Sequence, residues 1–577
     1  MAGAMDNQEV AAFLYEVADL LELQGVAFKP VAYRKAAGKI EQLDEPIGKM
    51  AEEGRLEDIP GVGESLAKKI DEILKTGKLA YLDRLRTEVP ESLKELVSIP
   101  EVGPKTAMIL YKDLGIKNIE ELKKALLEHK LHSIKGFGEK TEERILQGIR
   151  TIEARAGRML LGEAYPVGAT FVEYLRSKSL GPVSLGGSLR RGKETIGDID
   201  VLVGTDDADK ATKAFVSHPD VDEVIMQGPT KSSVRLRTGL QVDLRVLPRK
   251  SWGAALQYFT GSKEHNVALR SIAIKMGYKL NEYGVFDRKT DKLIASETEE
   301  DVYRAFGLTV MPPEIREDSG ELDAAKEGRL PRLVEAEEIR GDLHIHTNWS
   351  DGSSTLKEVA AAAISKKYKY ICISDHSQSL KIANGLSPDR LMKEIDLVRK
   401  TEQGLDGELR ILTGSEVDIL KDGSLDFPAS VLKDLDVVVA SVHSNFKMEK
   451  EDMTKRMIAA MESGWVDIIG HPTGRIIGQR EPYEVDLERV FEAAARLGVC
   501  MELNCYPDRL DLRDIHCRAA KEAGVSVAIG TDSHNVRHMD NLKYGVITAR
   551  RGWLEAGNIL NTRPFEELLK SLHGSRR

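Results

Sequence analysis

After residue 339, strand-like apolar runs alternate with helical stretches, and a polar side chain closes each run. The seven runs end in LHIH, ISDH, TGSE, ASVH, IIGH, MELN and TDSH. Strands separated by helices pair in parallel, so this order predicts a (β/α)7-type barrel or a related sheet. Such barrels build their active sites at the carboxyl ends of the strands. The polar residues are therefore expected to meet at one mouth of the barrel.

Residues at or near these strand ends are of the types that bind metal ions: His344, His346, Asp351, His376, Glu416, His443, His471, Asp532 and His534. The pair His344 and His346 could equally be two polar residues on the wet face of a strand, because alternate residues share a face. So many such residues at one barrel mouth favour a metal centre instead. Mixed imidazole and carboxylate ligands suit Zn²⁺, Mn²⁺ or Fe²⁺ better than Mg²⁺.

Two aspartates one residue apart indicate a different site in the front half. In GDIDVLV, Asp198 and Asp200 flank one apolar residue, so their carboxylates share a strand face. Asp243 stands alone among apolar residues in LQVDLRVL. A carboxylate in a buried strand is unfavourable unless it binds a cation or accepts hydrogen bonds. These three could hold two Mg²⁺ or Mn²⁺ ions for phosphoryl transfer. An exposed strand edge is the alternative.

Upstream of the aspartates, GGSLRR offers groups that suit a phosphate. These are the backbone N–H groups of Gly187 and Ser188 and the guanidinium of Arg191. The order Gly-Ser, nine residues, then Asp-x-Asp resembles the nucleotidyltransferase superfamily. This resemblance alone does not separate DNA polymerases from poly(A) polymerases, tRNA-end-adding enzymes or antibiotic-modifying transferases.

The first 155 residues have a helical pattern and contain an imperfect repeat. Its copies are IPGVGESLAKKI, IPEVGPKTAMIL and IKGFGEKTEERI. They resemble helix-hairpin-helix motifs, which implies that N–H groups of the turns bind the DNA backbone, with K⁺ or Na⁺ at the hairpins. The turn glycines are Gly61, Gly63, Gly103, Gly136 and Gly138. Glu101 replaces the first glycine of the second copy, and a plain helical turn is the alternative.

Together with these repeats, the segment YFTGSKEHNVALR resembles the family X DNA polymerases, the relatives of DNA polymerase beta. The resemblance implies that Tyr258, Phe259 and Gly261 form a turn against the sugar of the incoming nucleotide. The residues implied beside the nucleotide and the template strand are Lys263, Asn266 and Arg270. Lys263 departs from the animal enzymes, which have an acidic residue there.

The resemblance extends to Lys69 in ESLAKKI, which matches the Schiff-base lysine that removes a 5′-deoxyribose phosphate. A lysine must be neutral to act as a nucleophile, hence partly desolvated or close to other cations, and Lys68 is adjacent. A solvated lysine on a helix is the alternative.

The order of the barrel residues resembles the polymerase and histidinol phosphatase (PHP) domain. This resemblance implies about three ions, Mn²⁺, Zn²⁺ or Fe²⁺. It assigns one ion to His344, His346, Glu416 and Asp532, a second to Glu416, His443 and His471, and a third to Asp351, His376 and His534.

We therefore expect a multidomain chain with an α-helical N-terminal region, an α+β nucleotidyltransferase palm with a thumb, and a C-terminal PHP barrel. The expected segments are a lyase-like helix-hairpin-helix domain at 1–85, a DNA-binding helix-hairpin-helix domain at 86–155, the palm at 156–250, a nucleotide-selecting thumb-like domain at 251–317, a linker at 318–338 and the PHP domain at 339–577.

Composition adds few limits. The sequence has no apolar stretch that suits a membrane span and no signal-like leader. The four cysteines form no C-x-x-C pair and read as reduced thiols. A net charge of −10 does not exclude DNA, since part of the surface can still be basic. We expect a cytoplasmic monomer, associated with the nucleoid through DNA.

The whole architecture resembles that of bacterial and archaeal family X polymerases with a PHP domain, and this resemblance implies a DNA repair polymerase that fills short gaps in gapped or primed DNA with dNTPs. The attached barrel would be a metal-dependent 3′-5′ exonuclease, with cleavage at abasic sites as a further activity. Two alternatives stay open. The front half could be a DNA-binding module with vestigial polymerisation, or the barrel could be a small-molecule phosphatase.

Overall fold

The computed structural model of the chain describes residues 7–24, 26, 29–41, 43, 46–88, 93–97, 99, 102–133, 137–138, 141–146, 148–149 and 158–572. The chain divides into two compact units, residues 1–156 and 157–577. Each unit has buried apolar clusters of its own. Across the described residues, no helix combines the length and apolar character needed to cross a membrane.

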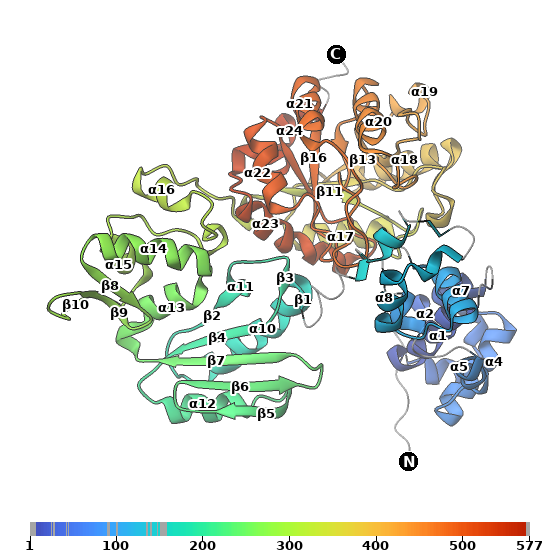
Figure 1. The fold of residues 1–577 in the computed structure, drawn as a ribbon. Helices are drawn as coiled ribbons and strands as arrows, with labels where there is room; N and C mark the ends of the chain where they lie inside the picture. Colours follow the sequence, from blue (N-terminus) through green and yellow to red (C-terminus); the bar gives the residue numbers. More distant parts are fainter. Residues whose placement is uncertain are drawn as a thin grey trace. The chain divides into compact units, whose positions relative to one another are not determined.

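The first unit consists of short helices around one apolar core (Figure 1). Its helices are α1 (Asn7–Leu23), α2 (Lys29–Glu41), α3 (Ile47–Glu52), α4 (Glu64–Thr76), α5 (Ala80–Glu88), α6 (Leu93–Val97), α7 (Pro104–Leu114) and α8 (Ile119–Leu127), and residues 141–146 are also helical. Helix α1 packs along α2. Leu14, Val17 and Ile40 are fully buried between them and their neighbours. The core explains why these short helices form, since helices of this length are marginal in isolation.

The glycine turns of the first two hairpins lead directly into helices. Gly61 has a φ of +89°, which favours glycine. Gly63 is the N-cap residue of α4 and Gly103 that of α7, and no side chain caps either helix. The first N–H groups of both helices can therefore face an anion. Gly138 is in the described part of the third copy, whereas the predicted turn glycine Gly136 lies outside the described residues.

In the second unit, a five-stranded sheet lies in the segment predicted to be the palm. The strand order is β2 (Val183–Leu185), β4 (Ile199–Gly204), β7 (Gln241–Leu247), β6 (Lys231–Leu236) and β5 (Val221–Gln227). Strands β4 and β7 are parallel, and the other pairs are antiparallel. The helices α10 (Leu161–Ser177) and α12 (Ala208–Val216) pack on the sheet, where Phe171 and Phe215 are fully buried. Parallel β4 and β7 are the strands that carry the predicted aspartates.

The thumb-like segment follows. It contains α13 (Trp252–Thr260), α14 (Lys263–Lys275), a small sheet of β8 (Tyr278–Asn281), β9 (Gly284–Asp287) and β10 (Leu293–Ala295), and α15 (Glu299–Arg304). The segment 318–338, predicted to be a linker, contains α16 (Glu321–Lys326). Glu321 is fully buried and lies 2.6 Å from His265 Nδ1, while His265 Nε2 lies 2.9 Å from the hydroxyl of Tyr303. This buried polar chain fixes α16 onto the thumb.

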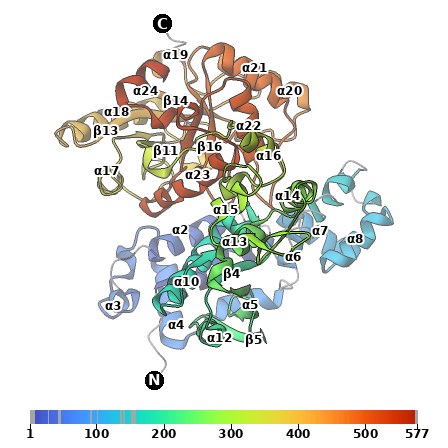
Figure 2. The same ribbon diagram turned by 90° about the vertical axis from the view of Figure 1, so that its left-hand side faces the viewer.

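The C-terminal part is a seven-stranded parallel sheet that curls into a nearly closed barrel. Its strands follow chain order: β11 (Gly341–Ile345), β12 (Tyr370–Ile373), β13 (Arg410–Asp418), β14 (Val437–Ser441), β15 (Ile468–Ile469), β16 (Cys500–Asn504) and β17 (Val527–Gly530). A bridge between Ile345 and Ser533 brings the first and last strands together. Figure 2 shows helices around the strands, among them α17 (Leu356–Ser365), α20 (Lys450–Glu462) and α23 (Leu542–Arg551). The predicted parallel barrel is confirmed.

Candidate active sites

The three predicted aspartates of the palm meet at one edge of the sheet. Parallel pairing of β4 with β7 sets Asp200 directly opposite Asp243. Asp198 precedes β4 by one residue. One carboxylate oxygen from each of the three lies within 4.8 Å of the others. Asp243 is buried, Asp200 is half-buried and Asp198 is exposed. The group is therefore open to solvent on one side.

The close carboxylates strongly affect one another. Burial, together with the charges of Asp198 and Asp243, raises the pKa of Asp200 to about 7. Burial would also raise the pKa of Asp243, but hydrogen bonds from Lys231 and Gln241 outweigh it and lower that pKa. Lys231 Nζ and Gln241 Nε2 each lie 2.8 Å from the Asp243 carboxylate. Three oxygen donors with excess negative charge are the set that hard divalent cations such as Mg²⁺ and Mn²⁺ prefer, so these residues fit such ions.

The predicted phosphate cradle lies beside the aspartates. Gly187 opens the short helix α11 (Gly187–Arg190) with a φ of +57°. A Cβ at this position would collide with the Asp200 carboxylate, so the close approach requires glycine. Ser188 follows in the same turn. Arg191 Nε donates to Glu317 at 3.0 Å, and its guanidinium also donates to the carbonyl of Thr260.

The turn YFTGS joins this cradle to the thumb. Phe259 places its ring 5.1 Å from the Arg245 guanidinium. Asn266 donates to the carbonyl of Tyr258 at 2.8 Å and is itself buried. Arg270 Nε donates to the carbonyl of Asn266 at 3.2 Å. Gly261 and Lys263 lie between these residues, with a φ of +73° at Gly261 and Lys263 at the start of α14. The predicted nucleotide-contacting residues thus gather around one turn.

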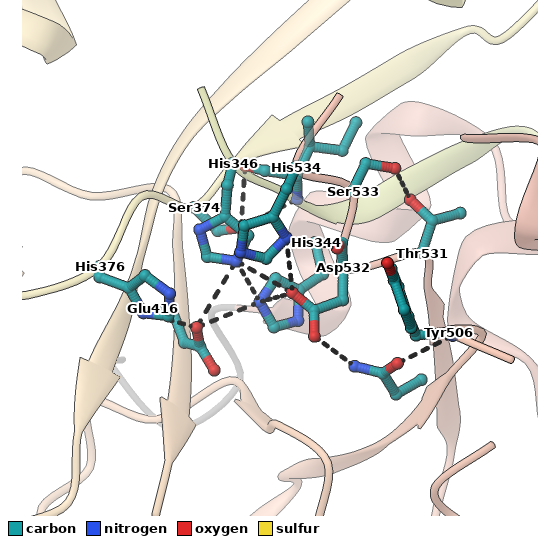
Figure 3. A network of polar contacts seen from close by, with 12 residues as sticks. His344, His346, Ser374, His376, Glu416, Tyr506, Thr531, Asp532, Ser533 and His534 are labelled. Carbon is teal, nitrogen blue, oxygen red and sulfur yellow. Dashed lines mark hydrogen bonds and ion pairs between the residues drawn. The ribbon is translucent and has the colours of Figure 1, made fainter. Parts of the chain in front are cut away.

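In the barrel, all nine predicted ligands converge at the carboxyl ends of the strands. Figure 3 shows His344, His346, His376, Glu416 and Asp532 pointing toward one another. Three groups of ligand atoms lie within 4.8 Å of one another: His344, His346 and Glu416; His376, Glu416 and His443; and His346, Asp351, His376 and His534.

The two remaining predicted ligands, His471 and Asp532, also contact members of these groups. His471 Nε2 lies 2.9 Å from Glu416 Oε1, and Asp532 Oδ1 lies 3.2 Å from His346 Nε2. Glu416, 1% exposed, belongs to two groups and is the centre of the cluster. His346 and His376 also belong to two groups each, so the side chains do not separate into the three sets that the PHP resemblance implies.

Several buried polar atoms of the cluster have no hydrogen-bond partner among the described residues. His376 Nδ1 lies 2.9 Å from Glu416 Oε2, yet within the described part of the chain neither atom has a hydrogen-bond partner. The same holds for the buried Nδ1 atoms of His346 and His471. Burying unpaired polar atoms is unfavourable by about 1–3 kcal/mol each. Imidazoles and carboxylates that point at shared points without hydrogen bonding fit divalent transition-metal ions.

Burial and close charges also shift the pKa values of the histidines in the cluster. Burial, with the charges of His376 and His534, lowers the pKa of His346 to about 4. Burial would lower the pKa of His443 too, but the charges of Glu416 and Asp418 outweigh it and raise that pKa to about 10. Without cations, protons on some histidines balance the buried carboxylates. Metal ions would replace those protons.

Comparison with known proteins finds matches in both halves of the chain. Family models match for a helix-hairpin-helix domain at residues 5–79, a SAM-like helix-hairpin-helix tandem at 93–151, a DNA polymerase beta thumb at 255–317 and a PHP domain at 342–505. The DNA polymerase/3′-5′ exonuclease PolX of Bacillus subtilis (strain 168) is 38% identical over 571 residues, which are 98% of this chain and 99% of that protein. The chain belongs to the PolX family.

Two further relatives match a smaller part of this PolX-family chain. A probable phosphatase of Caldanaerobacter subterraneus subsp. tengcongensis is 35% identical over 204 residues, 33% of the chain and 75% of that protein. A probable phosphatase of Thermoanaerobacter sp. (strain X514) is 31% identical over 232 residues, 38% of the chain and 89% of that protein. The matched lengths are those of one domain.

The structure adds residues that the sequence pattern missed. Glu502 lies 2.6 Å from His344 Nδ1 and accepts a hydrogen bond from the backbone N–H of His471. Asp418 lies 2.5 Å from His443 Nδ1. Carboxylates in such contacts fix the orientation of a metal-binding imidazole. The signal for Glu502 was present in the sequence, because it stands between apolar residues of MELN just as Asp243 does in LQVDLRVL.

An arginine also lies beside the barrel cluster. Arg509 Nε is 3.7 Å from Asp532 Oδ2, and its side chain is 22% exposed. Asn504, at the end of β16, donates to the same Asp532 oxygen at 3.0 Å. Arg509 lies in a turn with no regular pattern, so nothing in the sequence distinguishes it.

The raised pKa of Asp200 predicts how Mg²⁺ binding depends on pH. Below about pH 7 the cation must displace a proton, so its apparent affinity should rise about tenfold per pH unit and then level off above pH 7. Arg245 lowers the pKa of Asp200. Arg245→Met should therefore raise the pH at which the Mg²⁺ affinity levels off. Primer-extension rates against Mg²⁺ concentration at each pH measure this. An affinity that is constant between pH 5.5 and 7 would contradict it.

Glu502 predicts a second effect, on the barrel. Glu502→Gln keeps the shape of the side chain but removes the charge that orients His344, so metal affinity should fall by about 10–100-fold. The measurement is metal bound per chain after equilibrium dialysis against Mn²⁺. The exposed Glu492→Gln on α21 (Leu487–Leu497) is the matched control. Equal Mn²⁺ binding by both variants would show that Glu502 does not orient the ligand.

Proposed function

We propose that the chain is a DNA polymerase that fills short gaps in primed or gapped DNA with dNTPs, and that its barrel removes nucleotides from 3′ ends. The observation that carries this proposal is the presence of two complete ligand sets in one chain: three aspartates of the palm and nine residues of the barrel. The match to a DNA polymerase/3′-5′ exonuclease along nearly the whole chain supports it. Cleavage at abasic sites is a further activity of the same barrel.

The palm would hold two Mg²⁺ or Mn²⁺ ions through Asp198, Asp200 and Asp243. Divalent cations supply Lewis-acid charge for transfer and cleavage of phosphoesters in both sites. Asp243 is kept ionised by Lys231 and Gln241, so it can accept a hydrogen bond from the primer 3′-hydroxyl. Gly187, Ser188 and Arg191 hold the triphosphate. Arg191 exchanges its contact with Glu317 for the phosphate.

Nucleotide selection belongs to the turn at the end of α13. Tyr258 and Phe259 lie against the sugar and disfavour ribose. Asn266 donates to the Tyr258 carbonyl and accepts a hydrogen bond from Gln257 Nε2. These two bonds hold its side chain in one orientation, which suits a residue that contacts a base edge. Arg270 lies toward the template strand, and Lys263 adds a cation beside the nucleotide.

The barrel would hold about three ions, Mn²⁺, Zn²⁺ or Fe²⁺, with the nine ligands divided around Glu416. Arg509 is a partly exposed cation next to Asp532, and we assign it to the phosphate of the bond that is cut. Fusion to helix-hairpin-helix domains favours DNA over a small-molecule phosphate ester. The intact aspartate group and the YFTGS turn speak against a vestigial polymerase.

Lys69 fits a further role in the first unit. Its amine lies 3.0 Å from Ser65 Oγ, with the rings of Tyr33 and Tyr81 within 6.0 Å. Burial and the charge of Lys29 lower its pKa, which favours the neutral nucleophile. The adjacent Lys68 is exposed and pairs with Glu64 instead. The hairpin turns, with K⁺ or Na⁺, hold the DNA backbone, and the chain acts as a cytoplasmic, nucleoid-associated monomer.

Two single variants test the separation of the sites. On 5′-labelled primer across a one-nucleotide gap with a 5′ phosphate, Asp200→Ala should lower extension by about a hundredfold or more, equivalent to about 2.7 kcal/mol of barrier. His344→Ala should lose only primer shortening, because His344 is a predicted metal ligand of the barrel and not of the palm. Wild type that shortens the primer but never extends it, with dNTPs and Mg²⁺ or Mn²⁺, would overturn the polymerase proposal.

Adjacent lysines offer a matched test of the lyase role. Borohydride reduces a Schiff base between lysine and a 5′-deoxyribose phosphate end to a covalent adduct. Lys69→Ala should lower the adduct to background because Lys69 is the desolvated amine, whereas Lys68→Ala should keep it. Equal adduct yields in the two variants would show that Lys69 is not the nucleophile that forms the Schiff base.

A further inference from the structure

Outside the two active sites, a third group of metal-ligand side chains lies in the first unit. His129 follows the end of α8, and His132 lies in the short 3-10 turn Lys130–Ser133. Glu142 comes from the helical residues 141–146, after the third glycine turn. His129 Nδ1 is 2.8 Å and His132 Nε2 is 3.1 Å from the same oxygen, Glu142 Oε2. The two histidine rings have centroids 5.4 Å apart.

Glu142 indicates that this group is more than a surface contact. The residue is 4% exposed, whereas both histidines are exposed. Its second oxygen, Oε1, is buried and has no hydrogen-bond partner among the described residues. An unpaired buried carboxylate oxygen is unfavourable, and protein contacts satisfy only half of this carboxylate. Both imidazoles contact Oε2, which leaves the buried Oε1 without a protein partner among the described residues.

A divalent cation would account for all three side chains. Two imidazoles and one carboxylate are the donors of three-residue zinc sites, in which further positions stay open to water. The carboxylate can use both oxygens, which gives Oε1 a partner. The donors carry one negative charge in total when both histidines are neutral, so a doubly charged ion is not over-neutralised. Mg²⁺ prefers oxygen ligands and suits this set poorly.

We propose that His129, His132 and Glu142 form a Zn²⁺ site that joins the end of α8 to the helix after the third hairpin sequence. In the sequence, His132 and Glu142 flank the stretch IKGFGEK. A metal link across this stretch limits the conformations of a predicted backbone-binding turn, and the bound ion adds positive charge beside it. Zn²⁺ at this site therefore increases the affinity for the DNA backbone, independently of the barrel ions.

Residue-resolved histidine modification tests the site in the full-length chain. Metal-free protein is treated with diethyl pyrocarbonate with and without Zn²⁺, and modification is read by mass spectrometry at each histidine. Zn²⁺ should slow the reaction of His129 and His132 together by about tenfold, because a metal-bound imidazole has one nitrogen on the ion and a proton on the other, so no lone pair is free to react. His516, half-buried and outside every ligand group, is the internal control. Mg²⁺ should protect neither histidine.

A carboxylate variant separates a metal site from local packing. Glu142→Gln should abolish protection of His129 and His132 by Zn²⁺, while protection of the barrel residue His443 continues. If Glu142→Gln does not fold, His132→Ala should remove the protection of His129. Absence of Zn²⁺ protection in the wild type overturns the proposal. Protection that persists unchanged in Glu142→Gln or, where that variant is unfolded, in His132→Ala overturns it as well.

Discussion

Parallel strand pairing is the constraint on which both active sites depend, because it sets ionisable side chains from distant positions directly opposite one another. Asp200 pairs with Asp243 across β4 and β7, and His376 bridges to Glu416 beyond the paired part of β12 and β13. Burial and the neighbouring carboxylates make an ionised Asp200 unfavourable and raise its pKa to about 7. The apolar residues of the same strands are fully buried, and they hold these groups in place.

The barrel also contributes to the surroundings of the palm cradle. Arg551, from α23, donates to the backbone carbonyl of Arg191 at 2.7 Å and lies 3.1 Å from Glu317. Glu317 is also the partner of the Arg191 guanidinium. Arg475 of the barrel segment pairs with Glu194, between the cradle and the aspartates. The arginine assigned to the triphosphate is thus positioned in part by a barrel helix, which explains physically why residues 157–577 form one unit.

The residues that meet in each site were largely predictable, whereas their detailed partners were not. Alternation of strand and helix suffices to bring strand-end residues together, because parallel strands end at one mouth. Sequence spacing does not determine the orientation of an imidazole side chain. It therefore could not predict that His346 and His376 each belong to two ligand groups. Glu502 was missed since only strand ends were considered. The burial of Glu321 depends on His265, a partner 56 residues away that composition cannot reveal.

The two sites differ in how their charge is balanced, and this difference follows from their donors. The barrel mixes imidazoles with carboxylates, so protons on residues such as His443 compensate Glu416 within the protein itself. The palm has three carboxylates and only partial compensation from Lys231 and Arg245. In the proposed function, divalent ions from solution would complete its charge, and a triphosphate would carry such an ion with it. Imidazole ligands retain transition metals, whereas carboxylates alone exchange Mg²⁺ readily. One chain can therefore hold a resident metal centre and a site that is completed anew with each nucleotide.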